Sequence, residues 1–133
     1  TSLPVSRNEY LALDVTGFAG ERSGWRLPSV ACELENSRKD DLVAYSLWKL
    51  LCVQVRLRVL ICYRRDREKA PALVSQLARD VVTPLRLEDR LSVSGETLVV
   101  VGSRNESSTF PYGFFRTWKL NSNTGEFAAF SRG

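Results

Sequence analysis

A chain of 133 residues can bury one sizeable core, and its 44% hydrophobic and 26% charged residues are ordinary for a globular domain. The absence of histidine excludes His-ligated zinc sites, Ser-His-Asp triads and Cys-His pairs, so catalysis would have to use carboxylates, Lys, Arg, Tyr or hydroxyls. The 19 basic and 15 acidic residues give a net charge of +4, which tolerates a polyanionic partner without proving one.

The first segments predict a hairpin. "EYLALDVTGF" (9–18) and "VACELEN" (30–36) alternate between apolar and polar residues, which is the period of a β-strand. The turn dipeptide Ser23-Gly24 lies between them, so we expect the two strands to pair antiparallel.

The next segments predict a crossover. "SRKDD" opens a helix that Ser37 can cap, and the helix continues with an apolar majority to about Gln54. "VRLRVLICY" (55–63) ends in a near-continuous apolar run, which is typical of a central strand covered on both faces. A strand, helix and strand in one sheet form a right-handed parallel crossover.

The remainder predicts a helix from 71 to about 90, with Pro84 marking a break, and a short, strongly apolar strand over 96–103. "YGFFRTWKL" and "GEFAAF" flank "NSNTG" and are expected to form a closing hairpin. We therefore expect residues 1–133 to form one α/β domain with a mixed sheet, having a core over 9–64 and a C-terminal part over 71–130.

The three cysteines, Cys32, Cys52 and Cys62, stand among aliphatic residues without CxxC spacing. An odd number of such residues predicts buried free thiols in a reducing compartment, so we expect a cytoplasmic protein. The longest apolar run is far shorter than a membrane span, and no membrane partner is expected.

Three carboxylates draw attention in the predicted hairpin. If it turns on Ser23-Gly24, Asp14 lies opposite Glu33, and Glu35 follows on the same face. Carboxylates that converge repel one another unless they are neutralised, and Mg²⁺ or Mn²⁺ is the economical neutraliser. Such a metal can activate water and polarise a phosphoryl oxygen, which is the chemistry of phosphodiester hydrolysis.

Lys49 strengthens this interpretation. It stands in "SLWKLLC", and Leu42 and Cys52 are apolar positions on the same helical face, so the lysine is expected to point toward the sheet and the acids. The alternatives are solvated carboxylates on an exposed strand face and a lysine that extends out of the core.

These residues resemble the core of the PD-(D/E)XK nuclease superfamily, in which an acid on one strand precedes an acid-x-Lys motif on the next. The resemblance is carried by Asp14, by "ELE" at 33–35 and by the following helix and central strand, and it covers about residues 9–64. It implies a restriction-endonuclease-like, three-layer α/β fold with a mixed central sheet flanked by helices. Glu35 stands where the family usually has lysine, and Lys49 fits a lysine that has moved to the helix.

The resemblance implies that Asp14 and Glu33 are metal ligands. Glu35 would be a further ligand or a general base, and Lys49 would stabilise charge electrostatically. The implied cofactor is Mg²⁺ or Mn²⁺, and the implied substrate is DNA. The family's first helix is not evident in "TSLPVSRN", so we expect either a piece of a larger protein or a degenerate member.

Two basic segments are further candidates for contact with nucleic acid. Arg64 and Arg65 belong to "YRRDREK" at a strand end, where they could position phosphates or form a solvated loop. Arg116 and Lys119 alternate with aromatic residues in "FPYGFFRTWK", which fits a base-stacking platform but is more typical of a core strand.

Three hypotheses remain. The first is a metal-dependent nuclease-like domain acting on DNA. The second is an inactive domain of the same fold that serves in binding or assembly, and the third is an unrelated α/β interaction module with Asp14 and Glu33 far apart. The sequence leaves open whether the chain is an enzyme and whether it forms a homodimer or belongs to a larger protein or complex.

Overall fold

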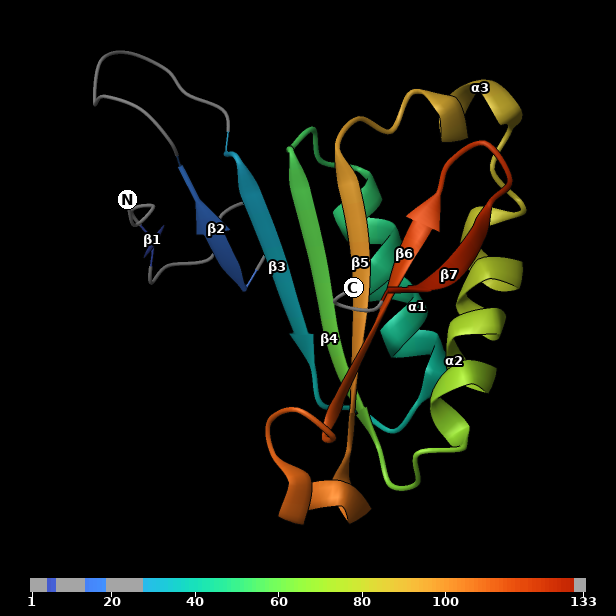
Figure 1. Cartoon of the computed structure of the whole chain (residues 1–133). Coiled ribbons are helices and arrows are strands. Elements are labelled where there is room, and N and C mark those ends of the chain that lie inside the picture. The colour runs from blue at the N-terminus through green and yellow to red at the C-terminus, as the bar shows by residue number, and fades with distance from the viewer. Residues whose placement is uncertain (1–4, 7–13, 19–27, 131–133) are drawn as a thin grey trace.

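The strands of this chain form one mixed sheet whose order in space is their order in the sequence (Figure 1). The structure is a computed structural model that describes residues 5–6, 14–18 and 28–130. Its seven strands in this part of the chain are β1 (Val5–Ser6), β2 (Val15–Gly17), β3 (Val30–Glu35), β4 (Leu57–Arg64), β5 (Glu96–Ser103), β6 (Phe115–Asn121) and β7 (Glu126–Phe130).

The predicted hairpin register is confirmed. Strands β2 and β3 pair antiparallel, with Val15 opposite Cys32 and Thr16 opposite Ala31, so the next pair in this register is Asp14 and Glu33. The turn dipeptide Ser23-Gly24 and residues 9–13 of the predicted strand lie outside the described residues. The observed register is the one predicted for a hairpin centred on Ser23-Gly24, and the alternation of apolar and polar residues supports it, because a shift of one residue would move every side chain to the other face.

The predicted parallel crossover is also confirmed. Strand β3 pairs parallel with β4, and β4 pairs parallel with β5, so β4 is a central strand. The closing hairpin of β6 and β7 pairs antiparallel, as expected from the turn residues between the strands. The chain therefore combines an antiparallel N-terminal edge, a parallel centre and an antiparallel C-terminal edge.

The helices connect the parallel strands. Helix α1 (Asp40–Leu51) joins β3 to β4, and helix α2 (Lys69–Leu77) continues into a π-helical segment, Ala78–Val82. The predicted helix over 71–90 is thus interrupted, with Pro84 in the break before α3 (Leu87–Leu91). A short 3₁₀ segment, Arg104–Thr109, follows β5.

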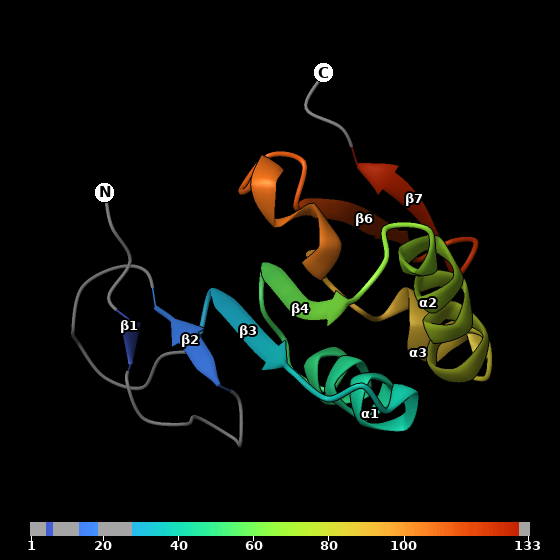
Figure 2. The ribbon, with the colours of Figure 1, turned by 90° about the horizontal axis from the view of Figure 1, so that it is seen from below.

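Helices α1 and α2 lie side by side on one face of the sheet, as Figure 2 shows from below. Apolar side chains of both helices pack against the strand side chains that point to this face of the sheet, and together they form the hydrophobic core. Its fully buried members include Val43, Leu47, Leu50, Leu60, Cys62, Val82, Val99 and Val101. The opposite face carries half-buried or exposed strand side chains, among them Leu34.

A buried arginine closes the end of helix α1. The Nε atom of Arg58 donates to the carbonyl oxygens of Leu50 and Val53 at 3.0 and 3.1 Å, and Nη1 donates to the carbonyl oxygen of Ser94. These carbonyls include groups that a helix end leaves without partners, so a guanidinium can be buried here on hydrogen bonds to the backbone. Burial lowers the pKa of Arg58.

Two details of the sequence prediction were wrong. Lys39, not Ser37, occupies the N-cap position of α1. The Ser37 Oγ atom instead accepts a hydrogen bond of 3.0 Å from the Lys39 N–H, before the helix begins. The thiols of Cys32, Cys52 and Cys62 are free, but Cys52 is exposed and Cys32 is half-buried, so only Cys62 fits the expected burial. Cys52 is exposed because it follows the last turn of α1, where the apolar face of the helix ends.

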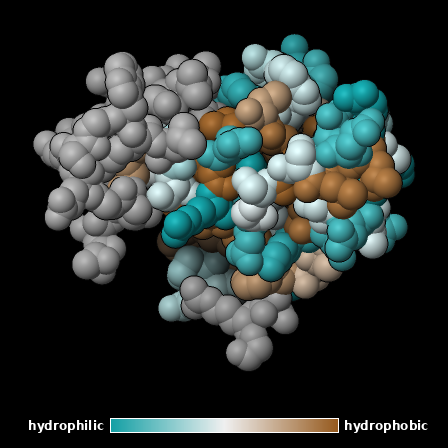
Figure 3. Space-filling model, turned by 90° about the horizontal axis from the view of Figure 1, so that it is seen from above, coloured by the Kyte–Doolittle hydropathy of each residue, from teal (hydrophilic) through white to brown (hydrophobic). Residues whose placement is uncertain are grey.

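Helix α3 lies at the end of the domain where the parallel strands begin. Its residues Leu87 and Leu91 are exposed, and the view of this end in Figure 3 shows apolar residues interspersed with hydrophilic ones. No helix in the described part of the chain is long and apolar enough to cross a membrane.

Candidate functional site

Asp14 and Glu33 meet where β2 and β3 stop pairing. Asp14 immediately precedes β2, and its Oδ2 atom accepts a hydrogen bond of 2.7 Å from the backbone N–H of Leu34, the residue after Glu33. The carboxylate therefore takes the place that a strand carbonyl would hold in the ladder. The predicted proximity of Asp14 and Glu33 is therefore confirmed, and the Asp14 carboxylate is near enough to raise the pKa of Glu33.

Lys49 completes this group from helix α1. Its Nζ atom lies 2.9 Å from Glu33 Oε1, and the side chains of Glu33 and Lys49 are 4% and 20% exposed. The Nζ atom also lies 5.6 Å from the centre of the Tyr45 ring, one helical turn earlier. The predicted orientation of Lys49 toward the acids is therefore confirmed. We call Asp14, Glu33 and Lys49 the acidic site.

Burial dominates the electrostatics of Glu33. It raises the pKa of the carboxyl group, and the nearby Asp14 carboxylate raises it further, while the Lys49 ammonium opposes both effects. For Lys49, burial lowers the pKa, but the Glu33 carboxylate outweighs burial and the net pKa is raised. The lysine is therefore held in its charged form, whereas ionisation of Glu33 costs free energy.

Glu35 points to the same helix but has different partners. Its Oε1 atom accepts a hydrogen bond of 2.9 Å from the Ser37 N–H, and its Oε2 atom accepts one of 3.3 Å from the Ser46 hydroxyl. Because Ser46 lies one helical turn before Lys49, the glutamates contact successive turns of α1. Glu35 thus connects the end of β3 with the loop and helix that follow.

The carboxylates of the acidic site can be compared with the ligands that the expected Mg²⁺ or Mn²⁺ would need. Within the ranges that the structure describes, no three acidic, histidine or cysteine side chains lie close enough to hold a metal ion. The neighbouring carboxylates of Asp14 and Glu33 are nevertheless hard oxygen donors, and Mg²⁺ is often bound by one or two carboxylates together with water and substrate phosphate. The residues therefore fit such a metal as a site of two carboxylates, not three.

A second candidate region is a cleft of about 620 Å³ at the carboxyl ends of β3, β4 and β5. Open α/β sheets commonly bind ligands at this edge. The cleft, which we call the basic cleft, is lined by cationic side chains: Arg38, Arg64, Arg65, Lys69 and Arg104.

Two carboxylates partly offset these charges. Asp40, at the start of α1, forms an ion pair with Arg64. Asp66 lies 3.7 Å from the Lys69 ammonium and accepts a hydrogen bond of 2.6 Å from Asn105, another residue of the cleft. The cations outnumber these carboxylates, so the cleft is a positive site.

The four residues predicted to contact nucleic acid lie in two different parts of the molecule. Arg64 and Arg65 line the basic cleft, while Arg116 packs its guanidinium 4.9 Å from the centre of the Trp118 ring on β6. Lys119 pairs with Glu96 at 2.9 Å, toward the other end of β5. Arg116 and Lys119 therefore do not contribute to the cleft.

Arg38 and Arg104 were not predicted from the sequence, and Lys69 was indicated only as the last residue of the candidate segment "YRRDREK". A signal was present, because cationic residues follow each of the three parallel strands: "SRK" after β3, "RDREK" after Arg64 and "RNE" after β5. Strands that run parallel bring the residues after them to one edge of the sheet. The cleft depends on the parallel pairing of β4 with β5, which local sequence patterns do not specify.

Comparison of the chain with models of protein families, with curated proteins and with solved structures found no match. The arrangement of its own residues is therefore the basis on which a function is proposed.

Proposed function

We propose that this chain is a metal-dependent, nuclease-like domain that hydrolyses phosphodiester bonds of DNA. The observation that carries the proposal is the acidic site, in which two neighbouring carboxylates from paired strands meet a lysine from the helix that follows. The antiparallel hairpin that leads into a parallel crossover is consistent with a restriction-endonuclease-like fold. The three-layer form of that fold, the cytoplasmic location and a homodimeric or larger assembly are parts of the same proposal.

Asp14 and Glu33 would hold Mg²⁺ or Mn²⁺, which when bound supplies Lewis acidity toward a phosphoryl oxygen and activates water. The chain's own contribution is electrostatic. Repulsion from Asp14 and burial both raise the pKa of Glu33, so the pair favours an added cation. Lys49, held protonated beside Glu33, can donate to a phosphate oxygen as negative charge develops there.

Glu35 enters this proposal as a positioning residue. Its carboxylate already accepts hydrogen bonds from Ser37 and Ser46, which fixes how β3 leads into α1. Because α1 carries Lys49, this connection holds the lysine at a defined distance from Glu33.

A second function is favoured by a specific observation, namely that each carboxylate already has a partner within the fold. Asp14 accepts from Leu34, Glu33 pairs with Lys49, and Glu35 accepts from Ser46. Carboxylates that are paired in this way would also be kept in an inactive domain of the same fold that binds nucleic acid or takes part in an assembly.

One experiment separates the two functions. Linear and branched DNA are incubated with the wild-type protein and with Glu33→Gln in Mn²⁺, Mg²⁺ or EDTA. We expect metal-dependent cleavage by the wild type and none by Glu33→Gln. Glu96→Gln is the matched control, because Glu96 belongs to a surface ion pair with Lys119 and its variant should cut normally. Equal cutting by all three proteins, or none by any of them, would leave the inactive module as the function.

A metal-binding measurement checks the same site without relying on turnover. Mn²⁺ should raise the unfolding temperature of the wild type, because a ligand that binds the folded state stabilises it. Asp14→Asn and Glu33→Gln should abolish this shift, and Glu96→Gln should retain it. A shift of equal size in all variants would place the metal elsewhere.

A further inference from the structure

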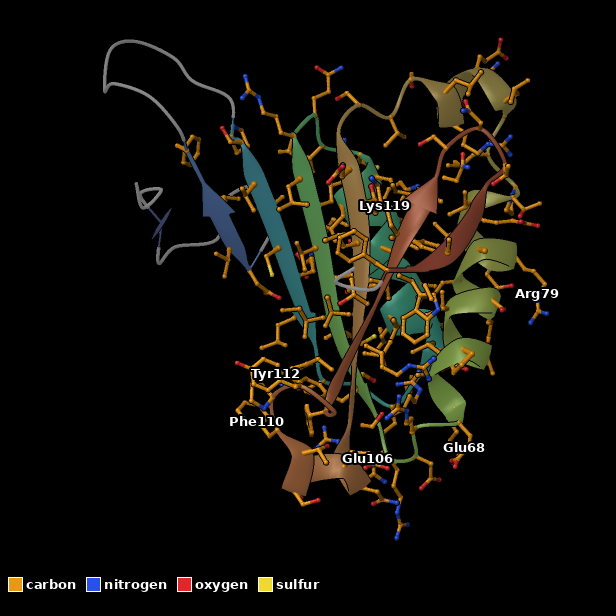
Figure 4. All side chains as sticks on the ribbon, in the orientation of Figure 1. Glu68, Arg79, Glu106, Phe110, Tyr112 and Lys119 are labelled. Atoms are coloured by element: carbon orange, nitrogen blue, oxygen red, sulfur yellow. The ribbon has the colours of Figure 1, made fainter. Side chains whose placement is uncertain are left out.

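An aromatic surface adjoins the basic cleft. The loop before β6 carries Phe110 and Tyr112, which are 62% and 85% exposed, and Figure 4 shows them close together near the end of the sheet where the cleft lies. Exposed aromatic rings offer large flat faces on which the rings of a partner can stack. We call these two residues the aromatic platform.

The platform rests on a packed base. The Phe110 ring lies 5.5 and 5.8 Å from the rings of Phe114 and Phe115, and the Phe114 ring lies 6.2 Å from that of Tyr63 on β4. Gly102 on β5 permits this packing, because a Cβ atom there would lie 2.6 Å from the Phe114 ring and 2.7 Å from the Tyr63 ring. The exposed Phe110 ring is therefore held in place by its neighbours.

Tyr63 joins the platform's base to the cleft. Its side chain lines the cleft, and the Arg104 guanidinium lies 5.3 Å from the centre of its ring. Helices α1 and α2 also begin at this edge, and the partial positive charge of a helix N-terminus adds to that of the cationic side chains. Tyr63 thus links the two features, since it contacts Arg104 of the cleft on one side and the Phe114 ring beneath the loop on the other.

We propose that the basic cleft and the aromatic platform together form a surface that binds single-stranded DNA, with phosphates in the cleft and unpaired bases stacked on Tyr112 and Phe110. Cationic grooves that follow the backbone, combined with exposed aromatic rings, are the means by which proteins bind single strands without sequence preference. A duplex offers the same phosphates but keeps its base faces stacked internally, so it can use the cleft and not the platform.

The proposal rests on the proposed function in one respect: the bound strand is the substrate of the acidic site. Asn36, which lines the cleft, follows Glu33 by three residues in the direction of β3, and a strand rises by about 3.3 Å per residue. The acidic site therefore lies on the order of 10 Å from the edge of the cleft, within reach of a strand that is anchored there.

Binding can be tested without cleavage. Fluorescence anisotropy is measured in EDTA with labelled dT20, with a mixed-sequence DNA duplex of equal length and with U20 RNA, using Glu33→Gln as the background so that no strand is cut. We expect dT20 to bind about tenfold more tightly than the duplex, because only its unpaired bases can stack on the aromatic platform. Duplex binding equal to or tighter than that of dT20 overturns the proposal, and U20 binding tenfold tighter than dT20 overturns the assignment to DNA.

Matched variants separate the two halves of the surface. Tyr112→Ala should weaken dT20 binding about fivefold or more without affecting the duplex, and Tyr112→Phe should restore it because the ring is retained. Arg65→Gln with Arg104→Gln should weaken both DNAs and lower the salt slope for dT20 by about 1.4, or about 0.7 for each phosphate that is no longer neutralised. Arg79→Gln, an exposed arginine on the π-helical segment (Figure 4), is the charge control.

The cleft variant removes two charges and Arg79→Gln removes one, so an Arg79→Gln loss half as large on a logarithmic scale would mean attraction by net charge alone and would overturn the proposal. Unchanged dT20 binding in Tyr112→Ala would also overturn it. The two proposals fail separately. Loss of cleavage in Glu33→Gln with unchanged dT20 binding supports both of them. Cleavage by the wild type together with no dT20 binding would retain the acidic site and remove the single-strand surface.

Discussion

The acidic site and the basic cleft differ in how far their charged side chains are buried and paired with opposite charge. In the acidic site, Glu33 is almost fully buried between sheet and helix and faces Lys49 at 2.9 Å. In the basic cleft, Arg38, Arg65 and Arg104 line a cavity open to water and form no ion pair with the residues that the structure describes. In the acidic site the buried Glu33 carboxylate has an opposite charge beside it, whereas the basic cleft carries an excess of exposed positive charge that a partner could neutralise.

This difference indicates how each region contributes to folding and binding. A buried charge that loses its partner costs several kcal/mol, so the acidic site is tied to the stability of the fold. Exposed cations of like sign repel one another weakly through water, so the cleft contributes little to stability and can be specialised for binding. Substitutions of the same type should therefore have opposite consequences in the two regions.

The largest effect is expected for Lys49→Met. The substitution keeps an apolar chain of similar length but leaves the Glu33 carboxylate buried without its ammonium, which should reduce the free energy of unfolding by about 3 kcal/mol at pH 7.5. Lys69→Met in the cleft is the matched control, because Lys69 is exposed and lies 3.7 Å from Asp66; it should cost less than about 0.5 kcal/mol. Urea unfolding of both variants measures the comparison, and equal losses would contradict it.

The loss in Lys49→Met should depend on pH. The pKa of Glu33 is raised in the folded protein, so its protonated form favours folding below the unfolded value near 4.5, and this advantage is lost as pH rises through the folded pKa. Removing Lys49 removes the effect that lowers this pKa, and the folded pKa should rise further. The deficit of Lys49→Met should therefore be largest at neutral pH and shrink toward pH 3.5, and Glu33→Gln should suppress it in the double variant. A deficit that is constant from pH 3.5 to 7.5 would point to altered packing instead.

The acidic site was largely predictable from sequence because it depends on local periodicity. Alternation over "VACELE" placed Glu33 and Glu35 on one face of their strand, and helical spacing turned Lys49 toward that face. That this is the buried face, with Leu34 exposed on the other, became evident only from the packing of α1 on the sheet. The partners of Glu35 could not be predicted in the same way, because the Ser46 contact depends on how closely α1 packs on β3. Arg58 was missed for a similar reason: nothing local distinguishes a buried arginine in "VRLRVL" from an exposed one until the helix end that it caps is placed.

The basic cleft was only half predictable. Arg64 and Arg65 stood out as neighbours in the sequence, but Arg38 and Arg104 join them only because β3, β4 and β5 are adjacent parallel strands. The exposure of Tyr112 was misjudged in the same way, because the aromatic segment was interpreted as core strand, whereas β6 begins only at Phe115.

An intermediate loss of stability is expected when the Asp14 carboxylate, which accepts a hydrogen bond from the Leu34 N–H, is removed. Asp14→Ala removes the acceptor of the Leu34 N–H and should lower the free energy of unfolding by about 1 kcal/mol. Asp14→Asn keeps an oxygen acceptor and should cost less than about 0.5 kcal/mol, yet it removes the carboxylate that raises the pKa of Glu33. Carboxyl NMR titration should therefore show a lower pKa for Glu33 in Asp14→Asn than in the wild type. An unchanged pKa would mean that Asp14 serves the strand end and does not couple to Glu33.

The smallest effect, and the one of opposite sign, is expected in the basic cleft. Arg38→Gln and Arg65→Gln each remove one of several like charges, so each should leave the free energy of unfolding unchanged or raise it by up to about 0.5 kcal/mol in 10 mM salt. The gain should vanish in 0.5 M salt, where screening already weakens repulsion between exposed charges. Urea midpoints at the two salt concentrations, with Arg79→Gln as the control, measure it. A loss of more than about 1 kcal/mol in either cleft variant would show that these arginines hold the fold together, and the cleft would then resemble the acidic site in the way its charges are used.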